Sequence, residues 1–288
     1  MHPYQHDHKA DLPFVLSVLK ESEASLCAKG IKAQDLVAIY NDYTGRLPEL
    51  EDIALLVAKT LKRQKDVHAV RFRVKEPLHL LKKIIRKKHE YPNRHLNSGN
   101  YLKFINDLVG VRALHIYKKA CHNISSYIHQ VWDLKREPYA YVKETNSAEA
   151  KHFTSQKYKL MVNDRGYKAQ HFIIKVNPLR QLYFVEIQVK TLFEEGWSEI
   201  DHCIRYPDHN PNELLNRLLW LLSLYTTKAE EVASCIDALT EDINHYKSDT
   251  KEKPAVTISQ LHSHIDKLPI DEQEKQYLYT CLAKFTKT

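Results

Sequence analysis

Glycine is scarce in this sequence, and none of the glycine spacings that bind phosphate is present. The chain has 6 glycines in 288 residues, roughly 2% against the usual ~7%. No two of them stand in a G-x-G-x-x-G or G-x-x-x-x-G-K-[ST] pattern. A Rossmann fingerprint and a Walker A loop are therefore excluded, and any phosphate would have to be bound by cationic side chains.

Paired cysteines and long apolar runs are also lacking. The 5 cysteines are scattered, without a C-x-x-C pair, which predicts reduced thiols in a cytoplasmic protein. No apolar run approaches the length of a membrane span, and the N-terminus lacks a signal-peptide core, so we expect no membrane association. His6 and His8 flank Asp7, but H-E-x-x-H is absent, and no structural metal site is predicted there.

Positive charge is abundant and unevenly distributed. The net charge is +7 and the isoelectric point is about 8.9. Between Lys59 and Glu90, 12 Lys and Arg residues stand against 3 acids. This balance favours a polyanionic partner such as a nucleotide, a nucleic acid or an acidic lipid. A solvated helix face explains the same segment equally well.

Periodicity predicts helices, then a mixed α/β core, then helices again. We expect helices in 10–66, strands at 70–75, 107–117, 170–176 and 181–190, helices from Pro77 and over 122–134, and an irregular stretch at 135–165 with one strand at 157–162. A long amphipathic helix or helix pair is predicted over 211–248, a linker at 251–254, and two short helices after it. The predicted domains are 1–66 (helical), 67–210 (core) and 211–288 (helical).

Two predicted strands carry polar side chains on one face. In the first, the core side is expected to hold Val70, Phe72 and Val74, and the other face Arg71, Arg73 and Lys75. In the last, Glu186 and Gln188 lie opposite an apolar face. Since a lone buried carboxylate is costly, Glu186 needs a cation. Either it pairs with an arginine as a structural ion pair, or it binds a divalent cation together with Asp107 in a phosphate-binding cleft.

Four motifs occur in an order that is typical of one family. They are Arg73-x-Lys75-x-Pro77-x-x-x-Leu81-x-Lys83, Asp107-Leu-Val-Gly-Val-Arg112, Gly166-Tyr167-x-x-x-His171, and Val185-Glu186-Ile-Gln188-Val-Lys190-Thr191, followed by Trp197-Ser-Glu-Ile-Asp-His202. Over residues 71 to about 206 the chain resembles the synthetase domain of the RelA/SpoT alarmone synthetases. No hydrolase half is apparent, so a small single-function synthetase is predicted.

The resemblance implies a nucleotidyltransferase-like mixed sheet and transfer of the β,γ-pyrophosphate of ATP to the 3′-hydroxyl of GDP or GTP, which makes (p)ppGpp. It implies the following roles. Arg73, Lys75, His79 and Lys83 contact ATP; Asp107 and Glu186 bind Mg²⁺; Glu186 is also the general base, supported by Gln188; Tyr167 stacks on the acceptor base; His171, Lys168 and Arg112 complete the acceptor site.

Departures from the family pattern concentrate on the acceptor side. His79 replaces a serine, Lys190 replaces an arginine, and the acceptor loop reads Arg165-Gly-Tyr-Lys-Ala-Gln-His171. The more cationic loop keeps two alternatives open: a relative that pyrophosphorylates the 3′ end of tRNA, and a catalytically inactive nucleotide-binding module. Retention of both Asp107 and Glu186 argues against the inactive module.

Leucines cover more than one face of the predicted 211–248 helix. These residues are Leu214, Leu215, Leu218, Leu219, Leu222 and Leu224. Such a surface packs either on the chain's own core or on a second copy, so a homo-oligomer through the C-terminal helices is a further expectation.

Overall fold

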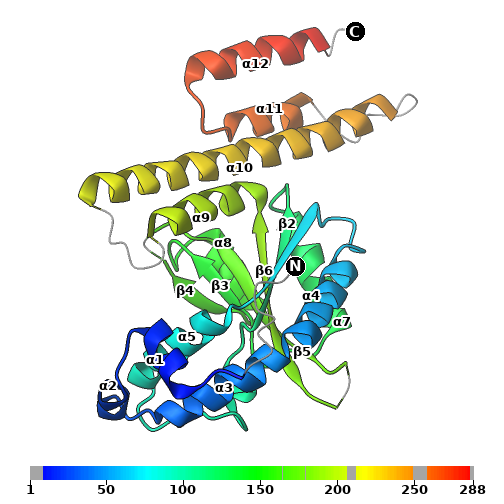
Figure 1. Ribbon diagram of the computed structural model, residues 1–288. Coiled ribbons are helices and arrows are strands. Elements are labelled where there is room, and N and C mark those ends of the chain that lie inside the picture. The colour runs from blue at the N-terminus through cyan, green and yellow to red at the C-terminus, as the bar shows by residue number, and fades with distance from the viewer. Residues whose placement is uncertain (1–8, 164, 179, 206–211, 249–257, 286–288) are drawn as a thin grey trace. The chain divides into compact units, whose positions relative to one another are not determined.

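The computed structural model describes residues 9–163, 165–178, 180–205, 212–248 and 258–285. Helices come first, a six-stranded mixed sheet with intervening helices follows, and four helices come after the last strand in the described residues (Figure 1). The predicted fold class, a mixed sheet flanked by N- and C-terminal helices, is confirmed. The His6-Asp7-His8 cluster and the 251–254 linker lie outside the described residues.

Four helices form between residues 12 and 61, as their periodicity predicts. They are α1 (Leu12–Leu19), α2 (Glu23–Ala28), α3 (Ala33–Gly45) and α4 (Leu47–Leu61). Asp11 caps α1 by accepting a hydrogen bond from the backbone N–H of Phe14 at 2.9 Å, and a proline stands in the first turn. Such a start satisfies N–H groups that have no partner inside the helix.

The six strands form one sheet in the order β1-β2-β6-β5-β3-β4. They are β1 (Ala69–Val74), β2 (Val109–His115), β3 (Tyr139–Val142), β4 (Lys159–Val162), β5 (Ala169–Val176) and β6 (Tyr183–Thr191). The pattern located five of them. It missed β3 and the helix α8 (Ala148–Ser155), both inside the stretch expected to be irregular, because a four-residue strand is too short to establish a period.

The edge strand β1 differs from its prediction at one position. Phe72 was expected on the core side, but 44% of it is exposed. The sheet order puts β1 at the edge, and α4 packs against it. Alternation assigns a residue to a face but does not say how far a neighbouring element covers that face at an edge.

Helix α5 (Pro77–Glu90) follows β1 and carries much of the positive charge. Leu80, Leu81 and Ile84 are buried, as predicted, whereas Ile85 is only half-buried. Pro77 starts the helix at a position where its missing N–H costs nothing. The short α6 (Tyr101–Phe104) precedes β2, and α7 (Ala120–Val131) follows it.

Contacts divide the chain into two compact units. Unit 1 comprises Met1–Ala113, Tyr127–Tyr139 and His171–Gln188; unit 2 comprises Leu114–Ser126, Ala140–Gln170 and Val189–Thr288. The strands β2, β5 and β6 contribute residues to both units.

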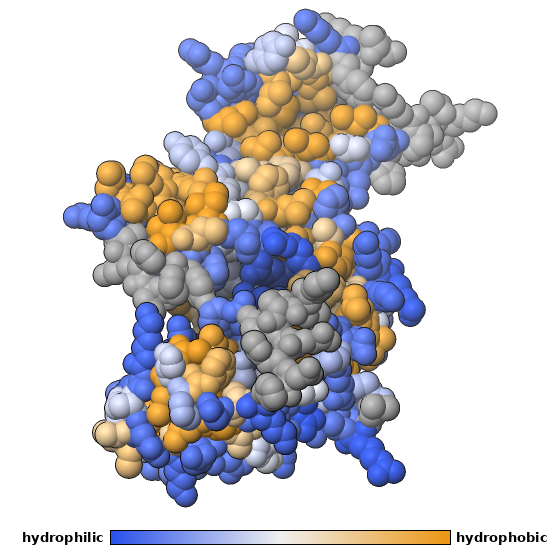
Figure 2. All heavy atoms as spheres, in the orientation of Figure 1, coloured by the Kyte–Doolittle hydropathy of each residue, from blue (hydrophilic) through white to orange (hydrophobic). Residues whose placement is uncertain are grey.

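Unit 2 contains α9 (Leu192–Arg205), α10 (Glu213–Ser248), α11 (Ile258–Asp266) and α12 (Glu272–Phe285). The long helix predicted over 211–248 is confirmed as α10. Leu219 is buried, but Leu214 and Leu218 are exposed, and apolar side chains gather over this end of α10 (Figure 2). The expected contact with a second copy stays a prediction.

None of the helices in the described ranges is both long and apolar enough to cross a membrane.

Candidate functional site

The polar sheet face predicted from alternation carries the candidate residues of unit 1. Arg73 on β1 lies across Gly110 of β2, where an added Cβ would be 3.7 Å from Arg73 Cγ. Arg112 follows two residues along β2 and is half-buried. Glu186 and Gln188 come from β6, which β2 and β5 flank in the sheet.

Asp107 is bound by two lysines from different elements. Its Oδ2 lies 3.1 Å from Lys75 Nζ and 2.6 Å from Lys83 Nζ. Lys75 directly follows β1, and Lys83 lies in the second turn of α5. The buried Tyr43 of α3 donates a hydrogen bond to the backbone carbonyl of Lys75 at 2.5 Å. Three elements therefore place two ammonium groups on one carboxylate.

Glu186 is hydrogen-bonded through both carboxylate oxygens. Oε1 lies 3.2 Å from Nδ1 of His171 on β5, and Oε2 accepts from Nε2 of Gln188 at 3.0 Å. Burial acts to raise the pKa of Glu186, but the hydrogen bonds from His171 and Gln188 and the charge of Lys83 outweigh it and lower the pKa to about 2. Because the carboxylate is ionised, the shared proton lies on His171 Nδ1.

The pKa values of two neighbouring basic side chains, Lys75 and His79, are lowered. Burial lowers the pKa of Lys75, opposed by Asp107 and reinforced by Lys83 and Arg73. Burial also lowers the pKa of His79, whose Nδ1 lies 3.4 Å from Glu76 Oε2. His79 is therefore uncharged at neutral pH and acts as a hydrogen-bonding group rather than a cation.

The predicted Mg²⁺ fits the donors in unit 1. Asp107 Oδ1 is buried and has no hydrogen-bond partner, so it is an available carboxylate oxygen, the donor type that Mg²⁺ prefers. Glu186 is ionised and lines the same cavity as Asp107. In the part of the chain that the structure describes, no group of three or more His, Cys, Asp or Glu side chains is arranged to hold a metal. Two carboxylates plus substrate phosphates would suit Mg²⁺, which usually takes few protein ligands.

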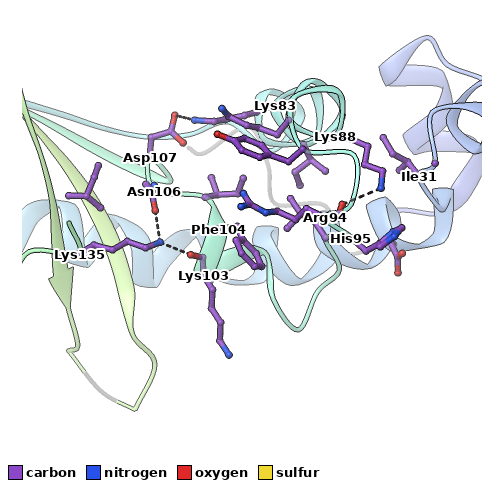
Figure 3. A pocket seen from close by; sticks show the side chains of 18 of the residues that line it. Ile31, Lys83, Lys88, Arg94, His95, Lys103, Phe104, Asn106, Asp107 and Lys135 are labelled. Atoms are coloured by element: carbon purple, nitrogen blue, oxygen red, sulfur yellow. Dashed lines mark hydrogen bonds and ion pairs between the residues drawn. The ribbon is translucent and has the colours of Figure 1, made fainter. Parts of the chain in front are cut away.

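A cavity of about 460 Å³ in unit 1 opens beside these residues (Figure 3). Among the residues that line it are Asp107, Glu186, Lys83, Arg94, Lys135 and Arg136. The last three were missed from the sequence because they lie in loops, where no period exists. The signal present was their charge: Lys135 and Arg136 stand together just after the predicted helix 122–134.

Tyr167 and Lys168 belong to unit 2. Tyr167 follows Gly166, whose φ of 92° suits glycine; a Cβ there would lie 2.6 Å from Ser223 Oγ. The Tyr167 ring packs edge-on against Tyr141 at 5.2 Å between centroids and lies 6.5 Å from Trp197. Lys190 Nζ is 5.6 Å from the ring centroid. The ring therefore sits in an aromatic cluster with a cation beside it.

Lys168 contacts two buried acids. Its Nζ donates to Thr227 Oγ1 at 2.8 Å and lies 3.8 Å from both Glu194 Oε1 and Glu230 Oε2. Glu194 Oε2 is buried without a hydrogen-bond partner. Burial and the charge of Glu230 raise the pKa of Glu194 to about 7, against the opposing charges of Lys168 and Lys190. The structure thus places the Lys168 ammonium in an ion cluster between α9 and α10.

Glu194→Gln is expected to stabilise the protein more at pH 8 than at pH 5. The raised pKa means that folding favours protonated Glu194, so its contribution to stability is lost as pH rises from about 4.5 through 7. At 1.36 kcal/mol per pKa unit the penalty reaches about 3 kcal/mol at pH 8. Thermal unfolding at both pH values measures it, with the exposed Glu231→Gln as control. An equal change at the two pH values would contradict this role for Glu194.

The fold and the candidate site define a class: a mixed α/β protein in which two carboxylates, one just before β2 and one on β6, line a single cavity together with lysines of α5. Residues 72–211 match the sequence profile described as "Region found in RelA / SpoT proteins". Residues 72–211, just under half of the chain, are therefore a RelA/SpoT region.

Several solved structures are similar to this chain. Small alarmone synthetase 1 from Bacillus subtilis is 18% identical, with 70% of this chain and 95% of that chain covered and a TM-score of 0.50. A structure of the same protein bound to its product pppGpp is 17% identical, covering 68% and 93%, with a TM-score of 0.46. A GTP pyrophosphokinase family protein from Streptococcus pneumoniae is 14% identical, covering 72% and 94%, with a TM-score of 0.47. No protein with curated annotation matches the sequence.

Proposed function

We propose that the chain is an ATP-dependent pyrophosphokinase that transfers the β,γ-pyrophosphate of ATP to the 3′-hydroxyl of GDP or GTP. The observation that carries the proposal is the pairing, in one cavity, of Asp107 bound by Lys75 and Lys83 with an ionised Glu186. Phosphoryl-type transfer depends mainly on positioning and on neutralising oxygen charge, and these groups supply both. The match of residues 72–211 to the region found in RelA/SpoT proteins supports the same reaction.

In the proposed reaction the acceptor 3′-oxygen forms a bond to the β-phosphorus of ATP, and the bond between that phosphorus and the α,β-bridging oxygen breaks, which releases AMP. Lys75 and Lys83 would lie against the transferred phosphates, with Arg73 contacting the ATP and His79 donating to it. Glu186 would accept the proton of the 3′-hydroxyl. Since its pKa of about 2 makes it a weak base, we assign the larger part of its contribution to metal binding.

Mg²⁺, held by Asp107 and Glu186, would neutralise the negative charge of the phosphate oxygens. Gln188 and His171 act on Glu186 itself: their hydrogen bonds keep the carboxylate ionised and fix its orientation. We propose that Tyr167 stacks on the guanine base, with Lys168 and Arg112 as further acceptor contacts. Base stacking on an aromatic ring is worth about 1–3 kcal/mol.

The purified chain should convert ATP with GDP or GTP into guanosine tetra- and pentaphosphate, with one AMP released per product. Chromatography after incubation with β-labelled ATP and each acceptor measures this. Transfer of label to tRNA, with no product from GDP or GTP, would establish the alternative acceptor. Absence of any product with every acceptor, from protein that binds ATP, would establish an inactive nucleotide-binding module.

The tRNA acceptor keeps one structural observation in its favour, the number of cations along the cavity. Lys87 and Lys88 line it beside Lys83, so neutralising them affects a mononucleotide reaction as well. Salt dependence separates the two acceptors better. A tRNA reaction should weaken steeply as salt rises because many phosphate contacts release counterions, whereas a mononucleotide reaction should weaken modestly.

A further inference from the structure

We infer that Arg94, Lys135 and Arg136 form a phosphate-binding subsite in the unit 1 cavity, separate from the lysines that hold Asp107, and that it takes the phosphate chain of a small ligand such as a nucleotide. All three side chains line the cavity. No ion pair joins any of them to a carboxylate within the described ranges. The inference goes beyond the proposed reaction, which assigns these residues no role.

Arg94 is held as a fixed planar donor. Its guanidinium carbon lies 4.5 Å from the centroid of the Tyr91 ring and 4.5 Å from that of Phe104, so the cation stands next to two aromatic rings (Figure 3). Such stacking leaves the in-plane N–H groups available. A guanidinium held in this way loses little side-chain entropy when its donors bind a phosphate through two parallel hydrogen bonds.

Lys135 is positioned by neutral oxygens. Its Nζ donates to the backbone carbonyl of Lys103 at 2.5 Å and to Asn106 Oδ1 at 2.7 Å, and it lies 3.6 Å from the centroid of the Phe184 ring. Neutral oxygens therefore use two of the three ammonium donors and the Phe184 ring lies on a further side, so Lys135 would act on a ligand through its charge. The Lys103 side chain itself runs away from Arg94 and Lys135 (Figure 3).

The three cations are close enough to repel one another. Burial, then the charges of Arg136 and Arg94, lower the pKa of Lys135 to about 8. Arg136 is fixed by the Tyr139 ring, whose centroid lies 4.3 Å from its guanidinium carbon. A cluster of positioned cations with no carboxylate counterion is stabilised by an added anion, and phosphate offers several acceptor oxygens at once.

Two of the three carboxylates that line the cavity are engaged by other groups. Both oxygens of Glu186 accept hydrogen bonds, and Asp107 binds its two lysines. Asp35 also lines the cavity, without an ion pair in the described part of the chain. At about 460 Å³ the cavity falls in the size range of small-molecule sites, which favours a nucleotide-sized ligand over a macromolecule.

Calorimetric titration of the full chain with inorganic triphosphate, in buffer containing EDTA, tests the subsite. Arg94→Gln is expected to weaken binding at least tenfold, and the Arg94→Gln, Lys135→Gln double variant further. The matched control Arg63→Gln, an exposed cation outside the cavity, should change affinity less than twofold. Melting temperatures establish that each variant is folded, and Arg94→Lys, which keeps charge but loses the fork, should fall between wild type and Arg94→Gln.

Two further arms make the result specific. In a Lys83→Met background, triphosphate binding that still depends on Arg94 supports a separate subsite; loss of that dependence would overturn it. A single-stranded oligonucleotide is titrated in parallel. If binding of the oligonucleotide depends on Arg94 while triphosphate does not bind, the inference of a small ligand is wrong. Because binding is measured without ATP turnover, these outcomes are independent of whether the proposed transfer reaction occurs.

Discussion

Replacing Glu186 by glutamine is expected to reduce pyrophosphate transfer at least 100-fold while leaving the melting temperature unchanged. Glutamine has the same shape and can still accept from His171 and pair with Gln188, so the fold loses little. It carries no charge, so it neither binds a divalent cation well nor accepts a proton. A 100-fold loss corresponds to about 3 kcal/mol of transition-state stabilisation.

Initial rates of AMP release with ATP and GDP measure the effect, and Glu231→Gln, an exposed residue of α10, is the matched control. Activity within tenfold of wild type, in a variant of unchanged stability, would refute the assignment. The pH dependence adds a second readout. With a pKa of about 2, Glu186 stays ionised from pH 5 to 9, so the wild-type rate should show no acid limb from this residue in that range.

Asp107→Asn should reduce transfer by a similar factor and, unlike the change at Glu186, should also lower stability. The carboxylate is the counterion of Lys75 and Lys83, and asparagine leaves two ammonium groups facing each other in a half-buried place. Charged hydrogen bonds of this kind contribute about 1.5–3 kcal/mol each. The Mg²⁺ concentration that gives half-maximal rate should rise, because one proposed ligand is lost.

Thermal unfolding and a Mg²⁺ titration of the rate measure the two effects, with the exposed Asp52→Asn as control. An unchanged Mg²⁺ requirement would remove Asp107 from the metal site even if the rate falls. An unchanged melting temperature would mean that the two ion pairs contribute no net stability, as is common for exposed pairs.

Strand alternation predicted the polar faces that the site uses. Glu186 and Gln188 fall on the predicted face of β6, and the order of β1 and α5 brings Lys75 and Lys83 to one carboxylate. These features depend on short-range periods, which a sequence records directly. The exposure of Phe72 could not be predicted from such a period, because it depends on which element covers the edge strand.

The features of the site that sequence patterns did not predict depend on contacts between segments that are distant in the sequence. The ion cluster around Lys168 was not predicted, because Glu194 and Glu230 come from later helices and nothing near Lys168 in the sequence indicates them. Arg94 was missed for the same reason: its stacking on Tyr91 and Phe104 requires a loop conformation that composition does not specify. Loop residues are where sequence patterns carry least information.

The hydrogen bond from Tyr43 to the carbonyl of Lys75 bears on where the functional module begins. The family profile starts at residue 72, yet this tyrosine, from a helix well before that point, fixes the backbone of the lysine that the profile contains. Truncating the chain at the profile boundary would remove that anchor and the packing of α3 on α5. The segment shared with the family in sequence is therefore shorter than the segment needed to hold Lys75 in place. The helices that precede the profile belong to the same structural unit as the candidate site.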